Sequence, residues 1–114
     1  MRSTTHMRLE DCAAVASGRT RFYVLTNNVE RHSTLGRVVD VAPHITCATF
    51  AVHEAINEPG WCVSDIESGA RTGYSLVSEA DAVSLAAGAL ALRTDVDVRR
   101  GREMLRERIA AREA

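Results

Sequence analysis

The pattern of apolar and polar residues predicts two strands in the first third of the chain. Residues 21–26, RFYVLT, are rich in aromatic and β-branched side chains, and the Asn27-Asn28 pair behind them is typical of a turn. Residues 35–41 carry three valines and end shortly before Pro43. They suit a second strand or an extended lead into a helix, because residues before a proline avoid helical geometry.

The clearest strand signal lies over residues 61–67, WCVSDIE. The segment alternates, with Trp61, Val63, Asp65 and Glu67 on one face and Cys62, Ser64 and Ile66 on the other. Ser68-Gly69 then supplies a turn into residues 70–75. We therefore predict a β-hairpin over residues 61–75.

Two interpretations remain open for residues 44–57, HITCATFAVHEAIN. As a strand, the segment has apolar residues on both faces and would have to be a buried central strand. As a helix, it has Pro43 in its first turn, and an apolar face formed by Ile45, Ala48, Val52, Ala55 and Ile56. The flanking prolines and a length of about 14 residues favour the helix.

A helix rich in alanine is predicted over residues 79–92. Ser78 is a good N-cap, and the acids Glu79 and Asp81 meet the positive end of the helix dipole. The helix is apolar nearly all round, which predicts that it is buried, and its small side chains allow close packing on a sheet. A shorter helix is predicted over residues 8–16.

The last segment, residues 95–112, predicts an amphipathic helix. Its narrow apolar stripe consists of Val98, Met104, Leu105 and Ile109, and this stripe must cover the domain itself or a second subunit. Its charged side is formed by Arg99, Arg100, Arg102, Arg106 and Arg108 together with Glu103 and Glu107. Residues 95–114 are therefore a candidate assembly or partner-binding element.

Together these elements predict a single α+β domain over residues 1–114. A small antiparallel sheet that includes the 61–75 hairpin is packed by the alanine-rich helix 79–92, and the amphipathic helix 95–112 follows it. A chain of 114 residues, 46% of them apolar, is long enough to bury a core of this kind.

Composition and charge argue against several classes of function. The formal net charge of -1 gives no overall attraction to nucleic acid or to an anionic membrane. The N-terminus lacks the apolar core of a signal peptide, and no run approaches the roughly 18 apolar residues of a membrane span, so we expect a cytoplasmic protein with no membrane partner. The three cysteines are widely spaced and odd in number, which indicates reduced thiols.

The chain has 14 arginines and no lysine. Lysine forms the Schiff base of pyridoxal enzymes and binds phosphate in ordinary P-loop nucleotide hydrolases. Both classes are therefore excluded. The arginine-only composition has two explanations that stay open at this point, a function or a coding bias.

Four potential ligands or catalytic groups, His44, Cys47, His53 and Cys62, lie close together in the sequence. Zinc needs about four such ligands in a tetrahedron, but only the His44-x-x-Cys47 spacing resembles a zinc knuckle. A nucleophilic Cys–His pair stays open, since such partners meet in space and not in sequence. Because small cysteines among alanines and valines are usually core residues, we expect no catalytic residue, no metal site and no cofactor.

Two further sets of charged residues are candidates for a functional site. Asp65 and Glu67 share one strand face and could pair as acid and base or hold a cation, although acids on an exposed sheet face are ordinary. The five arginines of the C-terminal helix have the chemistry to bind phosphates or an acidic partner. Glu103 and Glu107 lie within reach of these arginines, which favours a solvated helix with internal salt bridges.

Residues 61–92 resemble small α+β domains of bacterial plasmid and phage accessory proteins. The hairpin WCVSDIESGARTG followed by the capped helix SEADAVSLAAGALAL is also loosely similar to the hairpin and helix of HicB-type antitoxins. The resemblance implies a domain that acts by binding, and it assigns a role to no single residue.

We therefore expect a small non-enzymatic protein that acts by binding another protein or, as a homodimer, itself. An accessory protein of a bacterial mobile element, such as an inhibitor of a host defence system, fits this description. The alternative is a regulator associated with nucleic acid, or an antitoxin-like protein, that uses the arginine-rich helix. An enzyme that depends on Cys47, Cys62 or His53 ranks third.

Overall fold

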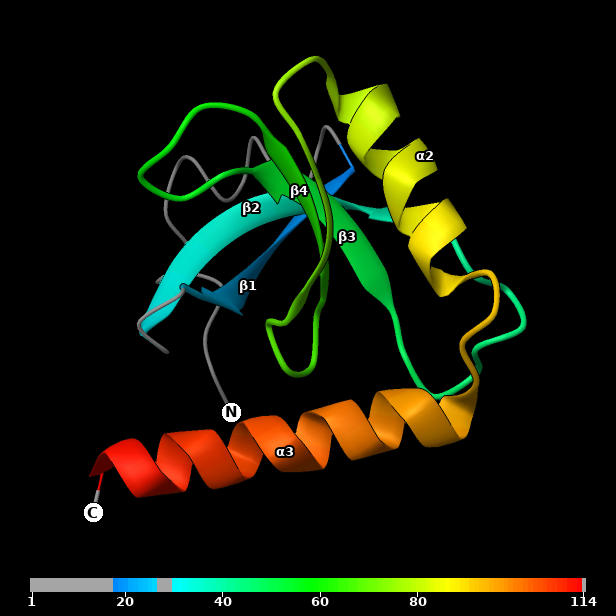
Figure 1. The fold of residues 1–114 in the computed structure, drawn as a ribbon. Coiled ribbons are helices and arrows are strands. Elements are labelled where there is room, and N and C mark those ends of the chain that lie inside the picture. Colours follow the sequence, from blue (N-terminus) through cyan, green and yellow to red (C-terminus); the bar gives the residue numbers. More distant parts are fainter. Residues whose placement is uncertain (1–17, 27–29, 114) are drawn as a thin grey trace, which may run out of the picture.

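The computed structural model describes residues 18–26 and 30–113, which form a five-stranded antiparallel sheet and two helices (Figure 1). The strands are β1 (Arg19–Leu25), β2 (Arg31–Val39), β3 (Phe50–Glu54), β4 (Trp61–Asp65) and β5 (Arg71–Ser75), and they are followed by the helices α2 (Glu79–Leu90) and α3 (Asp95–Glu113). The predicted α+β class is confirmed. The helix predicted over residues 8–16 lies outside the described residues.

Each strand pairs with its neighbours in sequence, in the order β1-β2-β3-β4-β5. The hairpin predicted over residues 61–75 is confirmed, with Trp61 opposite Ser75 and Cys62 opposite Tyr74. A register shift beside Ser64 marks an irregularity in this hairpin, of the kind that bends a strand. β2 begins earlier than the predicted 35–41, because the polar residues before Leu35 also pair with β1.

Residues 44–57 do not form the helix that we favoured. Residues 44–49 are an irregular loop, and β3 lies in the centre of the sheet between β2 and β4. Four of the five β3 residues are buried, as expected for a strand that is covered on both faces. The apolar residues on both faces of this segment fit its place as a central strand. In the turn that follows, Asn57 has a φ of 60°, which asparagine tolerates better than most residues.

The sheet is curled, so that β1 meets the turn between β4 and β5. The Leu25 N–H donates a hydrogen bond to the Gly69 carbonyl oxygen at 3.1 Å. Gly69 has a φ of +77°, and a Cβ there would lie 2.9 Å from the Val24 Cα, so glycine permits this approach. We call the sheet face that is enclosed in this way the inner face. It carries a small apolar cluster of Phe22, Val24 and Ala51, against which Ile56 and Ile66 pack.

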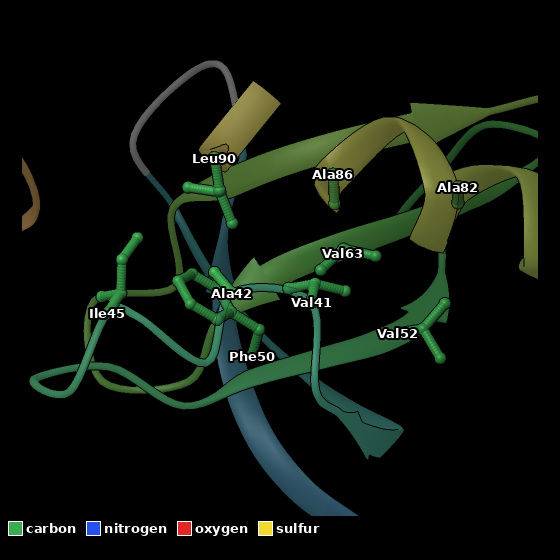
Figure 2. Packing of buried hydrophobic residues seen from close by; sticks show 9 residues of the cluster. All are labelled: Val41, Ala42, Ile45, Phe50, Val52, Val63, Ala82, Ala86 and Leu90. Atoms are coloured by element: carbon green, nitrogen blue, oxygen red, sulfur yellow. The ribbon is translucent and has the colours of Figure 1, made fainter. Parts of the chain in front are cut away.

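α2 packs on the opposite face of the sheet, over β3, β4 and β5. The predicted cap is present, since Ser78 Oγ accepts the Asp81 N–H at 3.0 Å. The buried side of α2 consists of Ala82, Ala86 and Leu90. Figure 2 shows these side chains with the residues of the sheet and of the loop before β3 that complete the main core: Val41, Ala42, Ile45, Phe50, Val52 and Val63.

The prediction that α2 is buried nearly all round is wrong. Only three of its residues are buried, and Leu85 on another side is 50% exposed. One side of the helix meets the sheet, and within the described part of the chain nothing covers the other side. An apolar outer surface on α2 is therefore a real feature of the fold.

α3 runs past the end of the sheet where β4 turns into β5, as Figure 1 shows. None of its described residues is fully buried, although Val98 packs against the main core. The predicted amphipathic helix is thus confirmed, and polar contacts hold much of it in place. Neither described helix has the length and apolarity that crossing a membrane requires.

Candidate functional site

The four candidate ligands His44, Cys47, His53 and Cys62 fall into two separate pairs. His44 and Cys47 lie in the loop before β3, beside the junction of α2 and α3. His53 and Cys62 are direct partners across β3 and β4. Within residues 18–26 and 30–113 there is no group of three or more His, Cys, Asp or Glu side chains that could hold a metal ion.

His44 and Cys47 belong to a set of hydrogen bonds that joins the loop before β3 to the junction of α2 and α3. We call this set of contacts the Asp95 clasp. His44 Nε2 lies 3.0 Å from the carbonyl oxygens of Leu90 and Arg93 and donates to them at the end of α2. Asp95, the first residue of α3, accepts the Thr46 N–H at 2.7 Å and the Thr46 hydroxyl at 2.6 Å. The two Thr46 bonds hold the pKa of Asp95 at about 2. This loop therefore fixes where α3 starts.

The second pair lies on the inner face, in a pocket of about 430 Å³. The pocket is bounded by the end of β1, the turn after β3, the start of β5 and one side of α3. Its floor includes His53, Cys62 and Ser64, and its rim includes Arg71 and Arg108. Pockets of this size, with a few convergent polar groups, are where proteins usually bind small molecules.

His53 is held in one orientation at the floor of this pocket. Its Nδ1 lies 2.7 Å from the Glu54 carbonyl oxygen, and its Nε2 lies 2.8 Å from Ser64 Oγ. The rings of Phe22 and His53 meet in a T-shaped arrangement, with their centroids 5.5 Å apart. Because the carbonyl can only accept, Nδ1 carries the proton, and in the neutral ring Ser64 donates to Nε2.

The His53–Ser64 pair has the arrangement of a base beside a hydroxyl. Burial lowers the pKa of His53, with a smaller contribution from the charge of Arg71, and these outweigh the opposite effect of the Glu54 carbonyl. A neutral imidazole of this kind can accept a proton. Ser64, however, is only 1% exposed, so its hydroxyl is covered and is not presented to a substrate. The bond satisfies two buried polar groups, which is reason enough for it to form.

Cys62 does not pair with His53, as a nucleophilic Cys–His pair would require. Its Sγ instead accepts from Arg71 Nη1 at 3.9 Å. Burial raises the pKa of the Cys62 thiol, and the nearby Arg71 offsets this only in part. The thiol is therefore protonated at neutral pH and is a poor nucleophile.

Asp65 and Glu67 do not form the acid pair or cation site considered from the sequence, and Asp65 is not on an exposed face. Arg102 Nε and Nη2 donate to the Asp65 carboxylate at 2.8 and 3.0 Å, and Arg102 Nη1 lies 3.1 Å from Glu67. Burial would raise the pKa of Asp65, but the hydrogen bonds from Arg102 and Ser68 and the charge of Arg102 outweigh it and lower the pKa.

Four other arginines of α3 do not take part in this contact. Arg99, Arg100, Arg106 and Arg108 are exposed and form no ion pair with any residue that the structure describes. The pairs with Glu103 and Glu107 that the sequence favours are therefore absent from this part of the chain. In the apolar stripe, Val98 packs on the core, Leu105 and Ile109 are half-buried, and Met104 is 58% exposed.

Sequence reasoning missed Ser64 and Arg71 as members of this site. The alternation of WCVS already places Cys62 and Ser64 on one sheet face. The pairing of β3 with β4 brings Cys62 and Ser64 next to His53. This pairing can be predicted only if residues 50–54 are identified as a strand.

The fold and the pocket define a small α+β domain with a curled antiparallel sheet, one helix on its outer face and a second helix across its end. Comparison with models of known protein families, with curated proteins and with solved structures found no match.

Proposed function

We propose that this chain is a small protein-binding domain without a catalytic role, and that it contacts its partner through the outer surface of α2. We define this α2 surface by four exposed apolar side chains: Leu85 in the helix itself, Leu76 and Val77 just before the helix, and Leu92 just after it. The partner is another protein or a second copy of the chain.

The exposure of these side chains is the observation that carries the proposal. Val77 is 83% exposed and Leu92 is 94% exposed, at the two ends of α2, and Leu85 lies between them. A single exposed leucine is ordinary, but four large exposed apolar groups in and immediately beside one helix of about 18 Å are not. Small residues such as Ser84 and Gly88 lie between them and allow another element to approach closely.

The groups on the inner face support a non-catalytic role. Ser64 is covered, and the thiol of Cys62 is held protonated by its burial. The same groups are fully engaged in hydrogen bonds that stabilise the fold.

The proposed setting is an accessory protein of a bacterial mobile element, for instance an inhibitor of a host defence system. The support for this setting is the resemblance of the hairpin and helix over residues 61–92 to such proteins. Small inhibitors of this kind act by covering a surface on their target, which is what an exposed apolar helix can do.

The test compares the full chain with two variants that carry the same substitution on different helices. Leu85→Asp places a charge in the α2 surface, whereas Met104→Asp places one at an equally exposed position of α3. Each protein is used to capture partners from a lysate of the source organism, and its native mass is measured by light scattering. Thermal unfolding of both variants verifies that they are folded.

A partner or a dimer that the wild type and Met104→Asp retain and Leu85→Asp loses would support the proposal. A complex that Leu85→Asp retains in full would place the contact elsewhere. A wild-type chain that is monomeric and captures no protein would show that the proposed function is wrong.

A second candidate function, binding of nucleic acid, is favoured by one observation. Four arginines of α3 are exposed and without ion pairs to described residues, so their guanidinium groups are available to phosphates. Fluorescence anisotropy with duplex DNA and with RNA at several salt concentrations tests it. If these side chains bind phosphates, Arg100→Gln and Arg106→Gln should each reduce the salt slope by about one.

A further inference from the structure

We propose that the inner-face pocket binds a small organic carboxylate, whose anion is held by Arg71 and whose apolar body lies between the sheet and α3. This inference goes beyond protein binding, and it uses the sheet face opposite to the α2 surface. The two activities are therefore separable by experiment.

Arg71 is held in place with one edge of its guanidinium unused. Nη1 donates to Glu58 at 3.1 Å and to Cys62 Sγ at 3.9 Å, and the guanidinium carbon lies 5.1 Å from the centre of the Tyr74 ring. Nε and Nη2 form no hydrogen bond with any residue of the described ranges. This Nε–Nη2 edge is the fork that binds a carboxylate through two parallel hydrogen bonds.

The charge around the pocket suits a ligand with a single negative charge. Arg71 stands on the β5 side and Arg108 on the α3 side, and Arg108 forms no ion pair with a described residue. Glu58 neutralises part of this charge because it already contacts Arg71. Two guanidinium groups and one carboxylate leave one positive charge at the rim, which favours a monoanion over a phosphate dianion.

One part of the pocket wall is apolar and suits the body of such a ligand. Val24 and Leu25 of β1, Ile56 of the turn after β3, and Leu105 of α3 line it. A volume of about 430 Å³ accommodates a ring or a short chain with its carboxylate. His53 and Ser64 below are bonded to each other, so they close the floor and leave recognition of the anion to Arg71.

The experiment is an NMR titration of the ¹⁵N-labelled full chain at constant ionic strength. Benzoate is the probe, benzamide is the uncharged molecule of the same shape, and phenyl phosphate is the dianion. We expect saturable shifts at the amides of Ile56 and Ala70 with benzoate and none at Leu85. We expect binding at least about tenfold weaker for benzamide, and for benzoate with Arg71→Gln, because a charge-assisted bond is lost in each case.

Arg99→Gln is the matched control, because it removes an exposed arginine of α3 outside the pocket and should leave benzoate binding unchanged. If Arg71→Gln fails to fold, Arg108→Gln tests the same rim charge and should weaken benzoate several-fold. The inference is overturned if benzoate gives no saturable shifts, or if Arg71→Gln binds it as the wild type does. Equal binding of benzamide would overturn the carboxylate assignment, and tighter binding of phenyl phosphate would replace it by a phosphate. None of these outcomes requires a partner at the α2 surface, so a failure of this inference and a failure of the proposed function are distinguishable.

Discussion

Arg102 of α3 and Asp65 of β4 form an ion pair with two parallel hydrogen bonds, and both side chains are almost completely covered, with 10% and 5% of their surface exposed. The residues are 37 positions apart in the sequence. Since α3 has no fully buried apolar residue among those described, this pair and the Asp95 clasp are its main polar attachments to the rest of the domain.

We expect Arg102→Met to destabilise the protein by about 3 kcal/mol, because it leaves the covered Asp65 carboxylate without its cation. The free energy of unfolding in urea at pH 7 measures this. Arg112→Met removes the exposed pair with Glu30 and should cost less than about 1 kcal/mol. Equal effects of the two substitutions would mean that the Asp65 pair is no stronger than a surface contact.

The same ion pair predicts how stability changes in acid. The pKa of Asp65 is lower in the folded chain than its ordinary value, because the bonds from Arg102 and Ser68 outweigh the effect of burial. The unfolded chain therefore binds the proton first, at about pH 4, and the stability that Asp65 contributes is lost as the pH falls from there through the folded pKa. Urea unfolding at pH values from 5 to 2 should show a smaller acid loss in Arg102→Met than in the wild type.

His53 predicts a second loss of stability at a higher pH. The pKa of His53 is lowered, mainly by burial. Below about pH 6.5 this side chain therefore binds a proton in the unfolded chain but not yet in the folded chain. Stability should fall as the pH decreases from about 6.5 to the folded pKa, and then stop responding to this group. NMR titration of the His53 ring gives the folded pKa directly. A midpoint at or above the ordinary value would contradict the burial that we describe.

Two glycines of the same domain should respond to alanine in opposite directions. In Gly73→Ala, the new Cβ would lie 2.8 Å from Ala86 Cβ and 2.9 Å from the Ala82 carbonyl oxygen, so α2 must move away from β5. We expect a loss of about 1–3 kcal/mol. In Gly88→Ala the Cβ meets nothing within 4 Å, and the helix should gain roughly 0.5–1 kcal/mol.

Urea unfolding and thermal midpoints of the two alanine variants provide the measurement. A neutral Gly73→Ala would show that the contact between α2 and β5 is looser than the structure indicates. A destabilising Gly88→Ala would show that the outer side of α2 is already covered by another part of the assembly.

The elements that local patterns predict correctly are those whose signal is complete within one segment. The hairpin over 61–75 has strict alternation and a turn, and α2 has its Ser78 cap. β3 was missed because a short apolar run suits a strand or a buried helix equally well. The deciding information is that β2 and β4 lie on either side of it, and this is a property of the whole sheet.

The candidate site was predictable only in part, for the same reason. His53 and Cys62 stand out from the sequence as reactive groups, and the structure places them opposite each other. Their actual partners, Ser64 and Arg71, are ordinary residues whose positions follow from strand register. The Arg102–Asp65 pair joins distant segments, and nothing local in the sequence distinguishes Arg102 from the other arginines of the same helix.

The strand order has a consequence for how the chain folds during synthesis. Because each strand pairs with the one made just before it, the sheet can grow hairpin by hairpin as the chain leaves the ribosome, with little loop-closure entropy to overcome at each step. The Leu25–Gly69 bond must wait for the last hairpin, and the Arg102–Asp65 pair must wait for α3. Leu25 lines one side of the inner-face pocket, and Leu105 and Arg108 of α3 line another, so we expect the pocket to be completed only when the final helix has docked.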